Sequence, residues 1–380
     1  MPWQEETRMS LRREFVALAK TEAIPFNQLC QRFGISRPTG YKWLVRARSN
    51  PQENFADRSR RPYTTPTKTS AELEYEALTV RTQHPAWGGR KINRILKDRG
   101  HKDVPAPSTV THILHRHGLI DPRQAGEGAI YHRFEHEMPN QLWQIDFKGH
   151  FATHSGRCGP LTVLDDHSRY NVVLHAMYST NTIPVKQVLT DTFRQYGLPY
   201  RINADNGQPW GSPRAQAHGI SKLSVWLIRL GVKVSFSRPA HPQTNGKDER
   251  FHRTLKAEVL KGKTFIDLQH AQHAFDEWRT IYNHVRPHDA LGLDVPASRY
   301  QPSPRPFPEC LPEIEYSPDD MVVTVNTKGF VSLNKQPMQV SKALVGLPVA
   351  FRKDHEHDGL YQLYFCHHRL GELDLRSIKA

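Results

Sequence analysis

The chain lacks several features that would place it outside the cell, in a membrane or among nucleotide-hydrolysing enzymes. It has only four cysteines in 380 residues, widely separated and without C-x-x-C spacing, which argues against a disulfide framework and a thiolate zinc site. No run of about 18 apolar residues occurs, and the first residues, MPWQEETRMS, are not a basic-then-apolar signal. No G-x-x-x-x-G-K-[ST] motif is present. We therefore expect a cytoplasmic protein with no membrane segment and no nucleotide cofactor. We expect reduced, buried thiols at Cys30, Cys158, Cys310 and Cys366.

Positive charge, by contrast, is in excess. The formal net charge is +14, and residues 1–135 hold 23 Lys and Arg against 14 Asp and Glu. Such a bias favours a polyanionic partner, with nucleic acid ahead of an anionic membrane and a merely solvated basic surface as the alternative. The length and the 37% apolar content predict several domains with two to four modest cores.

The first domain that we predict, residues 1–48, has a helical pattern. FNQLCQRFGISRPTGYKWLVRA divides into a helix, a turn at Gly34 and a second helix that Ser36 opens, with Pro38 in its first turn. This pattern resembles a helix-turn-helix, and an ordinary helical hairpin is the alternative. The side chains that the second helix would offer to DNA are Arg37, Thr39, Tyr41, Lys42 and Arg46.

A polar linker and a second helical unit follow. Residues 49–70 contain prolines and a run of arginines, and they predict an extended segment that lies along phosphates. Residues 71–121 predict a second DNA-binding domain of three helices, the last of them capped by Ser108 and bearing His115. A solvent-exposed face is the alternative for that helix. The residues expected to contact DNA in these segments are Arg58, Arg60, Arg61, Arg90, Lys91, His112 and Arg116.

After a short linker, residues 122–138, the pattern changes from helical to mixed. Residues 139–302 give three strands, the first of them LWQIDFKGHFAT, and then helix, strand, helix, strand and helix. This order predicts a mixed five-stranded sheet with flanking helices. Residues 303–380 give about five short strands with glycine turns, which predict a small β-barrel, with a dimerisation module as the alternative. The fold class is therefore multidomain: all-α units in front, an α/β core and a small all-β domain.

Two aspartates interrupt strand-like sequence in the central domain. Asp146 stands inside WQIDF, and Asp205 stands at the end of the fourth strand, in YRINADNG. A sheet tolerates such charges poorly unless they face a site or a partner. Asp205 alone would read as an ordinary turn residue, but Asp146 has no such explanation.

A third acid lies at the start of the last helix of that domain. The helix begins near Asn245, and at about 100° per residue Asp248 falls in line with the apolar Phe251 and Leu255. Asp248 therefore faces inward as a structural residue. Glu249 turns onto a flank with basic neighbours, either as a functional acid or as part of a solvated face.

These motifs together resemble a known family. WQIDF, NADNG and HPQTNGKDERFHRTLK are similar to the three acidic blocks of DDE-type transposases of bacterial insertion sequences, which are related to retroviral integrases. LTVLDDHSRY and YNHVRPHDALGLDVPASRY resemble further blocks of that branch, and the two helical units in front resemble its usual arrangement. The resemblance spans roughly Pro139 to Tyr300. Jointly these motifs are specific, whereas none of them is specific alone.

The resemblance implies an RNase H-like core in which Asp146, Asp205 and Glu249 are catalytic and hold two Mg²⁺ ions, with Mn²⁺ as a substitute. It implies a transposase that binds the terminal inverted repeats of its element, cleaves the 3′ end and joins it to target DNA, in a bacterial, nucleoid-associated setting. The partners would be double-stranded DNA and further copies of the chain, at least a dimer. The last domain would be an SH3-like barrel. Basic residues near the metals, expected on DNA or on a solvated surface, are His241, Arg250, Arg253 and Lys256.

Smaller roles are expected for other polar residues of the core. Asp165 and Asp166 precede Arg169 at a strand end and predict a structural turn with an ion pair rather than a metal site. Arg286 and His288 are expected to anchor a helix end to the core.

One interval departs from the family. Asp205 and Glu249 are 44 residues apart, more than is usual, and the surplus falls in PWGSPRAQAHGISK, where a surface loop is inexpensive to lengthen.

The alternative function is a non-catalytic helix-turn-helix regulator or a decayed transposase. A pure regulator would have no reason to keep all three acids.

Overall fold

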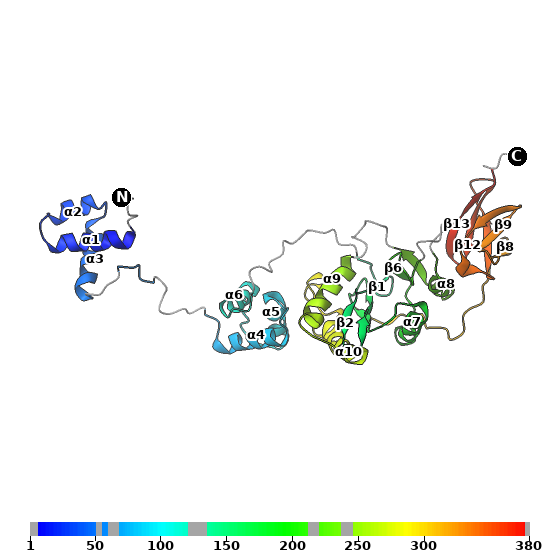
Figure 1. Ribbon diagram of the computed structural model, residues 1–380, viewed down its shortest axis with the longest axis horizontal. Helices are drawn as coiled ribbons and strands as arrows, with labels where there is room; N and C mark the ends of the chain where they lie inside the picture. Colours follow the sequence, from blue (N-terminus) through cyan, green and yellow to red (C-terminus); the bar gives the residue numbers. More distant parts are fainter. Residues whose placement is uncertain are drawn as a thin grey trace. The chain divides into compact units, whose positions relative to one another are not determined.

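A computed structural model of the chain (Figure 1) describes residues 7–50, 55–59, 68–120, 135–211, 220–236 and 246–376. The chain divides into two compact units, Met1–Lys68 and Thr69–Ala380. Among the described helices, none is both long and apolar enough to cross a membrane. All four cysteines are free, as expected, but only Cys30 and Cys158 are buried; Cys310 is exposed and Cys366 is partly exposed.

The first unit contains three helices around a small aromatic core. They are α1 (Arg8–Lys20), α2 (Phe26–Arg32) and α3 (Arg37–Ser49). Gly34 adopts a φ of +60° between α2 and α3, and the Ser36 hydroxyl accepts a hydrogen bond from the Thr39 N–H. Phe15, Leu29 and Trp43 fill the core. The predicted order of helix, turn and capped helix is confirmed.

The second unit begins with three more helices. These are α4 (Ala71–Gln83), α5 (Gly89–Asp98) and α6 (Pro107–Arg116), packed around Val80, Trp87, Ile92, Leu96 and Leu114. The prediction that Ser108 caps the third helix is wrong. The cap residue is Ala106, because Pro107 has no N–H and a φ already suited to the first helical position.

The helix α5 lies against the loop that follows the last core helix. Lys91 Nζ lies 2.9 Å from Asp289 Oδ2, and Arg94 lies 3.2 Å from Asp294 Oδ1. Ile281 of the core also packs against the cluster of α4 to α6. Apolar packing and ion pairs therefore join the second helical domain to the core.

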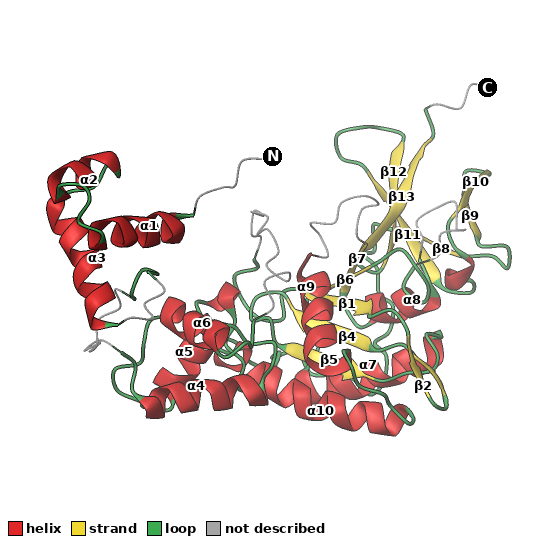
Figure 2. Ribbon diagram, turned by 60° about the vertical axis from the view of Figure 1, so that its left-hand side comes forward, coloured by secondary structure: helices red, strands yellow, loops and turns green. Residues whose placement is uncertain are grey.

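The core is a five-stranded mixed sheet in the order β5-β4-β1-β6-β7 (Figure 2). Pairs β5–β4 and β4–β1 are antiparallel, whereas β1–β6 and β6–β7 are parallel. One face packs against α7 and α8, and the other packs against α9 and α10. The predicted sheet and the three predicted helices are confirmed, and a fourth helix, α10, follows them. The strands are β1 (Trp143–Phe147), β4 (Leu161–Asp165), β5 (Asn171–His175), β6 (Arg201–Ala204) and β7 (Lys233–Phe236), and the helices are α7 (Thr182–Tyr196), α8 (Lys222–Arg229), α9 (Gly246–Leu255) and α10 (Leu268–His284).

One local feature of the core differs from the prediction. LWQIDFKGHFAT was expected to be a single strand, but β1 ends at Phe147 and a separate hairpin follows. The hairpin pairs β2 (Phe151–Thr153) with β3 (Gly156–Cys158). Its turn is fixed by the Ser155 hydroxyl and N–H, which both donate to Ile266 O, a long-range contact that no local pattern contains.

The end of α10 buries a histidine beside cations. His288 is 8% exposed, stacks edge-on against Tyr282, and lies 3.5 Å from Arg286 Nη1. A short 3₁₀ turn, Asp289–Leu291, follows it, and a second spans Pro296–Ser298. The predicted anchoring of the helix end by Arg286 and His288 is confirmed.

This burial predicts a loss of stability in mild acid. Burial, and then Arg286 and Lys91, lower the pKa of His288 to about 3. The unfolded chain takes up this proton near pH 6.5 whereas the folded chain does not, so stability rises with pH between about 3 and 6.5. We expect the free energy of unfolding to fall by ~2 kcal/mol through this group between pH 7.5 and pH 5. Urea unfolding at pH 7.5 and pH 5 should show a smaller fall in the free energy of unfolding for His288→Gln than for the wild type. An equal fall would show that His288 is not the group responsible.

The C-terminal residues form two small sheets. Six strands, where about five were expected, form a four-stranded sheet, β13-β12-β11-β8, and a two-stranded sheet, β10-β9. The pairings among the described residues do not close a barrel, so the predicted SH3-like barrel is not confirmed. These strands share a hydrophobic cluster with the core. The strands are β8 (Met321–Thr324), β9 (Phe330–Leu333), β10 (Gln336–Gln339), β11 (Pro348–Lys353), β12 (Leu360–Phe365) and β13 (His368–Asp374), with a 3₁₀ turn at Lys342–Leu344.

Candidate active site

Asp146 and Asp205 stand at the same edge of the central sheet. β1 and β6 are parallel, and Gln144 pairs with Asn203. Asp146 and Asp205 each lie two residues further along, so both reach the carboxyl ends of these strands. Asp205 Oδ1 accepts a hydrogen bond of 3.0 Å from the Gly207 N–H. A Cβ at residue 207 would lie 3.0 Å from the Asp205 carboxylate, so glycine allows this turn to hold Asp205.

Glu249 and Asp248 face different ways from the first turn of α9. Asp248 is 1% exposed, in line with the buried Phe251 and Leu255, whereas Glu249 is exposed. The predicted division between the two neighbours is confirmed. Asn245, near which the helix was predicted to begin, lies outside the described residues. Within the described structure Asp248 Oδ1 has no hydrogen-bond partner, and burial, followed by Asp146 and Asp166, raises the pKa of this carboxyl well above its ordinary value.

Asp205 and Glu249 both act electrostatically on Asp146. Burial, together with the carboxylates of Asp205 and Glu249, raises the pKa of Asp146 to about 6, against the opposing effects of the Phe147 N–H and Lys148. The Phe147 N–H donates to Asp146 Oδ1 at 2.8 Å. Among the described residues, no three His, Cys, Asp or Glu side chains are close enough together to hold a metal ion. The three acids therefore lie near one another, but their carboxylates do not meet at one point in this structure.

A histidine that we did not single out from the sequence ties α9 to the sheet. His252 Nε2 lies 2.8 Å from the Thr162 hydroxyl, which donates to Asp146 O at 3.0 Å. Because that hydroxyl's hydrogen points to Asp146 O, its oxygen accepts from His252 Nε2. Burial and Lys148 lower the pKa of His252 to about 4, so the ring is neutral near pH 7. The signal was its position three residues after Glu249, on the same side of the helix.

A second polar cluster lies beside the first. Asp166, 1% exposed, accepts a hydrogen bond of 3.0 Å from Gln144 and forms an ion pair with Lys247. Gln144 and Lys247 were also not singled out. Alternation in WQIDF, with Gln144 two residues before Asp146, was an available signal, because residues i and i+2 of a strand share a face.

The turn after β4 is structural, as predicted, but its ion pair is not the expected one. Asp165 accepts hydrogen bonds from the Ser168 N–H at 2.8 Å and the Asn140 N–H at 2.7 Å. Arg169 pairs with Glu135 at 3.2 Å rather than with either aspartate. The expected pair was wrong because the neighbours of a buried arginine come from a distant segment, which sequence proximity does not reveal.

The far end of α9 is locked to α10. The chain continues from α9 as a π-helical turn, Lys256–Leu260. Glu258 lies in this turn with its side chain 9% exposed, and it accepts hydrogen bonds from Trp278 Nε1 at 2.8 Å and from Arg286 Nε at 2.9 Å. This buried pair fixes the orientation of the helix that carries Glu249.

The predicted DNA-contacting residues of the first unit fall into two groups. Arg37, Tyr41 and Lys42 are exposed on α3. Thr39 instead contacts the Ser36 hydroxyl at 2.9 Å, and Arg46 stacks over Trp43 and donates to Ala56 O. Arg58 lies in the short described segment 55–59, whereas Arg60, Arg61 and His241 lie outside the described residues.

In the second unit, several of these cations already have protein partners. Arg90 and Lys91 pair with Asp289, and Arg116 pairs with Glu74 at 2.5 Å. His112 is exposed on α6. Arg250 and Arg253 on α9 are exposed, and so is Lys256 at the start of the π-helical turn. Contact with DNA stays a prediction for all of these residues.

Family comparisons match most of the chain in four segments. Two protein families, both described as "Integrase core domain", match residues 136–242 and 230–296. "IS481 family transposase, C-terminal domain" matches residues 320–380, and "Homeodomain-like domain" matches residues 39–114. The five-stranded mixed sheet lies within the integrase-core matches.

Two relatives come from bacterial insertion elements. An uncharacterized 39.2 kDa protein of insertion element IS476 from Xanthomonas euvesicatoria is 25% identical over 61% of this chain and 65% of its own length. An uncharacterized 31.7 kDa protein of IS407 from Burkholderia multivorans is 30% identical over 56% of this chain and 74% of its own length. The chain thus spans about two thirds to three quarters of these relatives.

Solved structures give weaker similarity. The HTLV-2 integrase catalytic core domain in complex with magnesium is 15% identical, with 43% of this chain and 99% of that one covered and a TM-score of 0.33. A simian T-cell lymphotropic virus intasome in complex with PP2A regulatory subunit B56 gamma is 16% identical, with 78% and 99% covered and a TM-score of 0.38. These scores alone do not establish a shared fold. The sequence relatives and the matched domains do establish a family: the chain belongs to the insertion-sequence transposases with an RNase H-like integrase core.

Proposed function

We propose that this transposase binds the terminal inverted repeats of its mobile element and catalyses Mg²⁺-dependent 3′-end cleavage and strand transfer into target DNA. The observation that carries the proposal is the placement of Asp146, Asp205 and Glu249. They come from β1, the end of β6 and the first turn of α9, and the carboxylates of Asp205 and Glu249 both raise the pKa of Asp146. No purely structural role accounts for all three.

The donor set fits Mg²⁺ in chemistry. Mg²⁺ prefers oxygen ligands and retains several waters, so three carboxylates together with substrate phosphates suffice. Asp146, Asp205 and Glu249 would hold two such ions, and Mn²⁺, which suits the same oxygen ligands, would substitute. When bound, the ions would supply activation of the attacking oxygen and stabilisation of the leaving oxygen.

The chain's own residues position these groups. The Gly207 N–H holds the Asp205 carboxylate, and the Phe147 N–H holds that of Asp146. Neutral His252, through Thr162, joins the helix of Glu249 to the strand of Asp146. These partners hold two of the carboxylates, and the helix that carries the third, in place before substrate arrives.

The reaction has two displacements at phosphorus. Water attacks the phosphodiester at the element's end, the P–O3′ bond breaks, and a 3′-OH is released. That hydroxyl then attacks a target phosphodiester, and a new P–O bond replaces the one that breaks. Because one phosphodiester replaces another in the joining step, no ATP is needed.

The remaining domains would recognise DNA and assemble the complex. Residues 1–48 and 71–121 would bind the inverted repeats, with the exposed Arg37, Tyr41 and Lys42 of α3 in the major groove. The segments 49–70 and 122–138 would act as linkers between residues 1–48, 71–121 and the core, residues 139–302. Residues 303–380 would act as an SH3-like module, and bringing two ends together would need at least a dimer.

The test uses the DNA that flanks the gene. If inverted repeats bracket it, a duplex ending in one repeat should be nicked at its 3′ end and joined to a plasmid in Mg²⁺ or Mn²⁺, as resolved on a denaturing gel. EDTA should abolish both products without abolishing binding. Binding without any cleavage in either metal would favour the non-catalytic regulator.

A further inference from the structure

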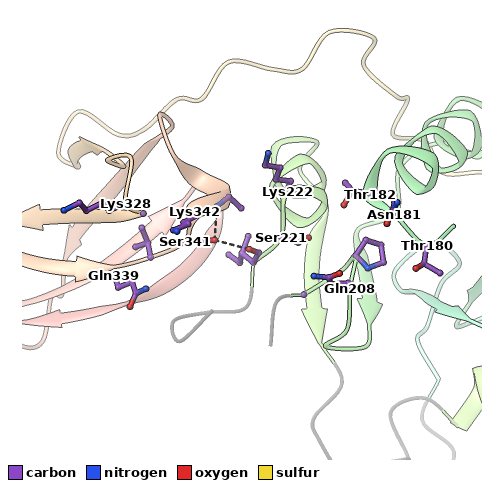
Figure 3. A pocket seen from close by; sticks show the side chains of 16 residues that line it. Thr180, Asn181, Thr182, Gln208, Ser221, Lys222, Lys328, Gln339, Ser341 and Lys342 are labelled. Carbon is purple, nitrogen blue, oxygen red and sulfur yellow. Dashed lines mark hydrogen bonds between the residues drawn. The ribbon is translucent and has the colours of Figure 1, made fainter. Parts of the chain in front are cut away.

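A polar cavity opens between the core and the C-terminal strands, apart from the three acids. Its volume is about 560 Å³. Figure 3 shows Ser221 and Lys222 on the core side and Ser341 and Lys342 on the other. The Ser341 hydroxyl donates to Ile220 O at 3.1 Å and joins the two walls. Both walls belong to the second compact unit.

The lining of this cavity is positively charged. The described residues that line it include Lys222, Lys328 and Lys342, and none of these described residues is an aspartate or glutamate. All three lysines are exposed, and none has an ion pair with another described residue. Uncompensated like charges around one space repel one another, and an anion between them would remove that repulsion.

The helix N-termini at the cavity carry partial positive charge, as the lysines do. α7 begins at Thr182 in the cavity wall, has no acid in its first turn, and receives no side-chain bond from Asn181. α8 begins with Lys222 itself and also has no acid in its first turn. A lysine at the first position of a helix has the unfavourable sign for the helix dipole. Both helices would therefore gain from an anion in the cavity, in addition to the lysines.

The position of the cavity indicates which anion it serves. Gln208, Pro209 and Gly211 line it, and they belong to the loop that follows Asp205. The lining is polar, which suits a charged backbone rather than an apolar ligand. We propose that this cavity binds backbone phosphates of a DNA strand that runs past the candidate active site. This proposal rests on the proposed function and adds a DNA-binding surface outside the residues predicted from the sequence.

Charge reversal tests the surface in the full-length protein. The probe is a fluorescein-labelled duplex of unrelated sequence, measured by anisotropy in EDTA at several salt concentrations. Lys222→Glu and Lys342→Glu should each weaken binding about tenfold and reduce the slope of log affinity against log salt by about one. Lys335→Glu is the matched control, because Lys335 lies in the β9–β10 turn, at the opposite end of that hairpin from Gln339. It should change neither quantity.

Stability separates loss of binding from damage to the fold. Glutamate at the first position of α8 suits the helix dipole, so Lys222→Glu should melt at the same temperature as the wild type or higher. Wild-type affinity and salt slope in both cavity variants would overturn the proposal, and so would full displacement of DNA by millimolar inorganic phosphate, which would mark a small-anion site. A wild type that binds DNA but never cleaves it would refute the proposed function alone. A wild type that does not bind DNA would refute both.

Discussion

Asp146→Asn, Asp205→Asn and Glu249→Gln should each reduce end cleavage and strand transfer at least about a thousand-fold, or ~4 kcal/mol of barrier. Each change removes one negative oxygen donor and keeps the size of the side chain. Binding of end-containing DNA in EDTA should persist, and it should be equal or tighter because a negative charge near the phosphates is lost. Gel assays of cleavage and joining, with anisotropy for binding, check both parts.

Asp248→Asn is the matched control for Glu249→Gln. Asp248 is adjacent in sequence but buried, so it faces away from the solvent side on which Glu249 lies. A neutral amide of the same shape should keep cleavage within about threefold of wild type, because a buried isosteric change perturbs packing little. An inactive Asp248→Asn beside an active Glu249→Gln would show that the catalytic acid is Asp248 and not Glu249.

Removal of one member of the buried Glu258–Arg286 pair should give the largest loss of stability. The side chains are 9% and 11% exposed, and Glu258 also accepts from Trp278. Glu258→Ala or Arg286→Ala leaves the other charge buried without its partner, at a cost of about 3 to 5 kcal/mol. Calorimetric melting temperatures should fall by roughly 10 °C or more. The melting temperature of Glu258→Gln, which keeps an acceptor for Trp278, should fall less.

The surface pair Arg194–Glu309 provides the comparison. Its side chains are 48% and 64% exposed, with a nitrogen–oxygen distance of 2.7 Å. Water screens such a pair, so Glu309→Ala should leave the melting temperature unchanged within error. A similar fall in melting temperature in Glu258→Ala and Glu309→Ala would mean that burial does not distinguish these two ion pairs. The contact between α9 and α10 would then be weaker than we infer.

Local sequence rules accounted for much of the fold. The capped helix after Gly34, the strand at WQIDF, and the inward Asp248 beside an outward Glu249 all follow from backbone periodicity and cap chemistry. Those rules depend only on neighbours within one or two turns of chain. They failed at Ser108, where the proline beside it starts the helix, and at β2–β3, whose turn is held by Ile266.

Asp146 could be singled out from the sequence because it interrupts a strand-like pattern, whereas Asp205 and Glu249 were singled out by the resemblance of NADNG and HPQTNGKDERFHRTLK to the family's acidic blocks. Their shared edge, the His252–Thr162 link, the Lys247–Asp166 pair and the lysine-lined cavity were decided only by the tertiary structure. The physical reason is that electrostatic and hydrogen-bond partners are chosen by distance in space. Strand order and helix packing set those distances, and residues about 90 positions apart, such as Thr162 and His252, come into contact only when the sheet and its helices have assembled.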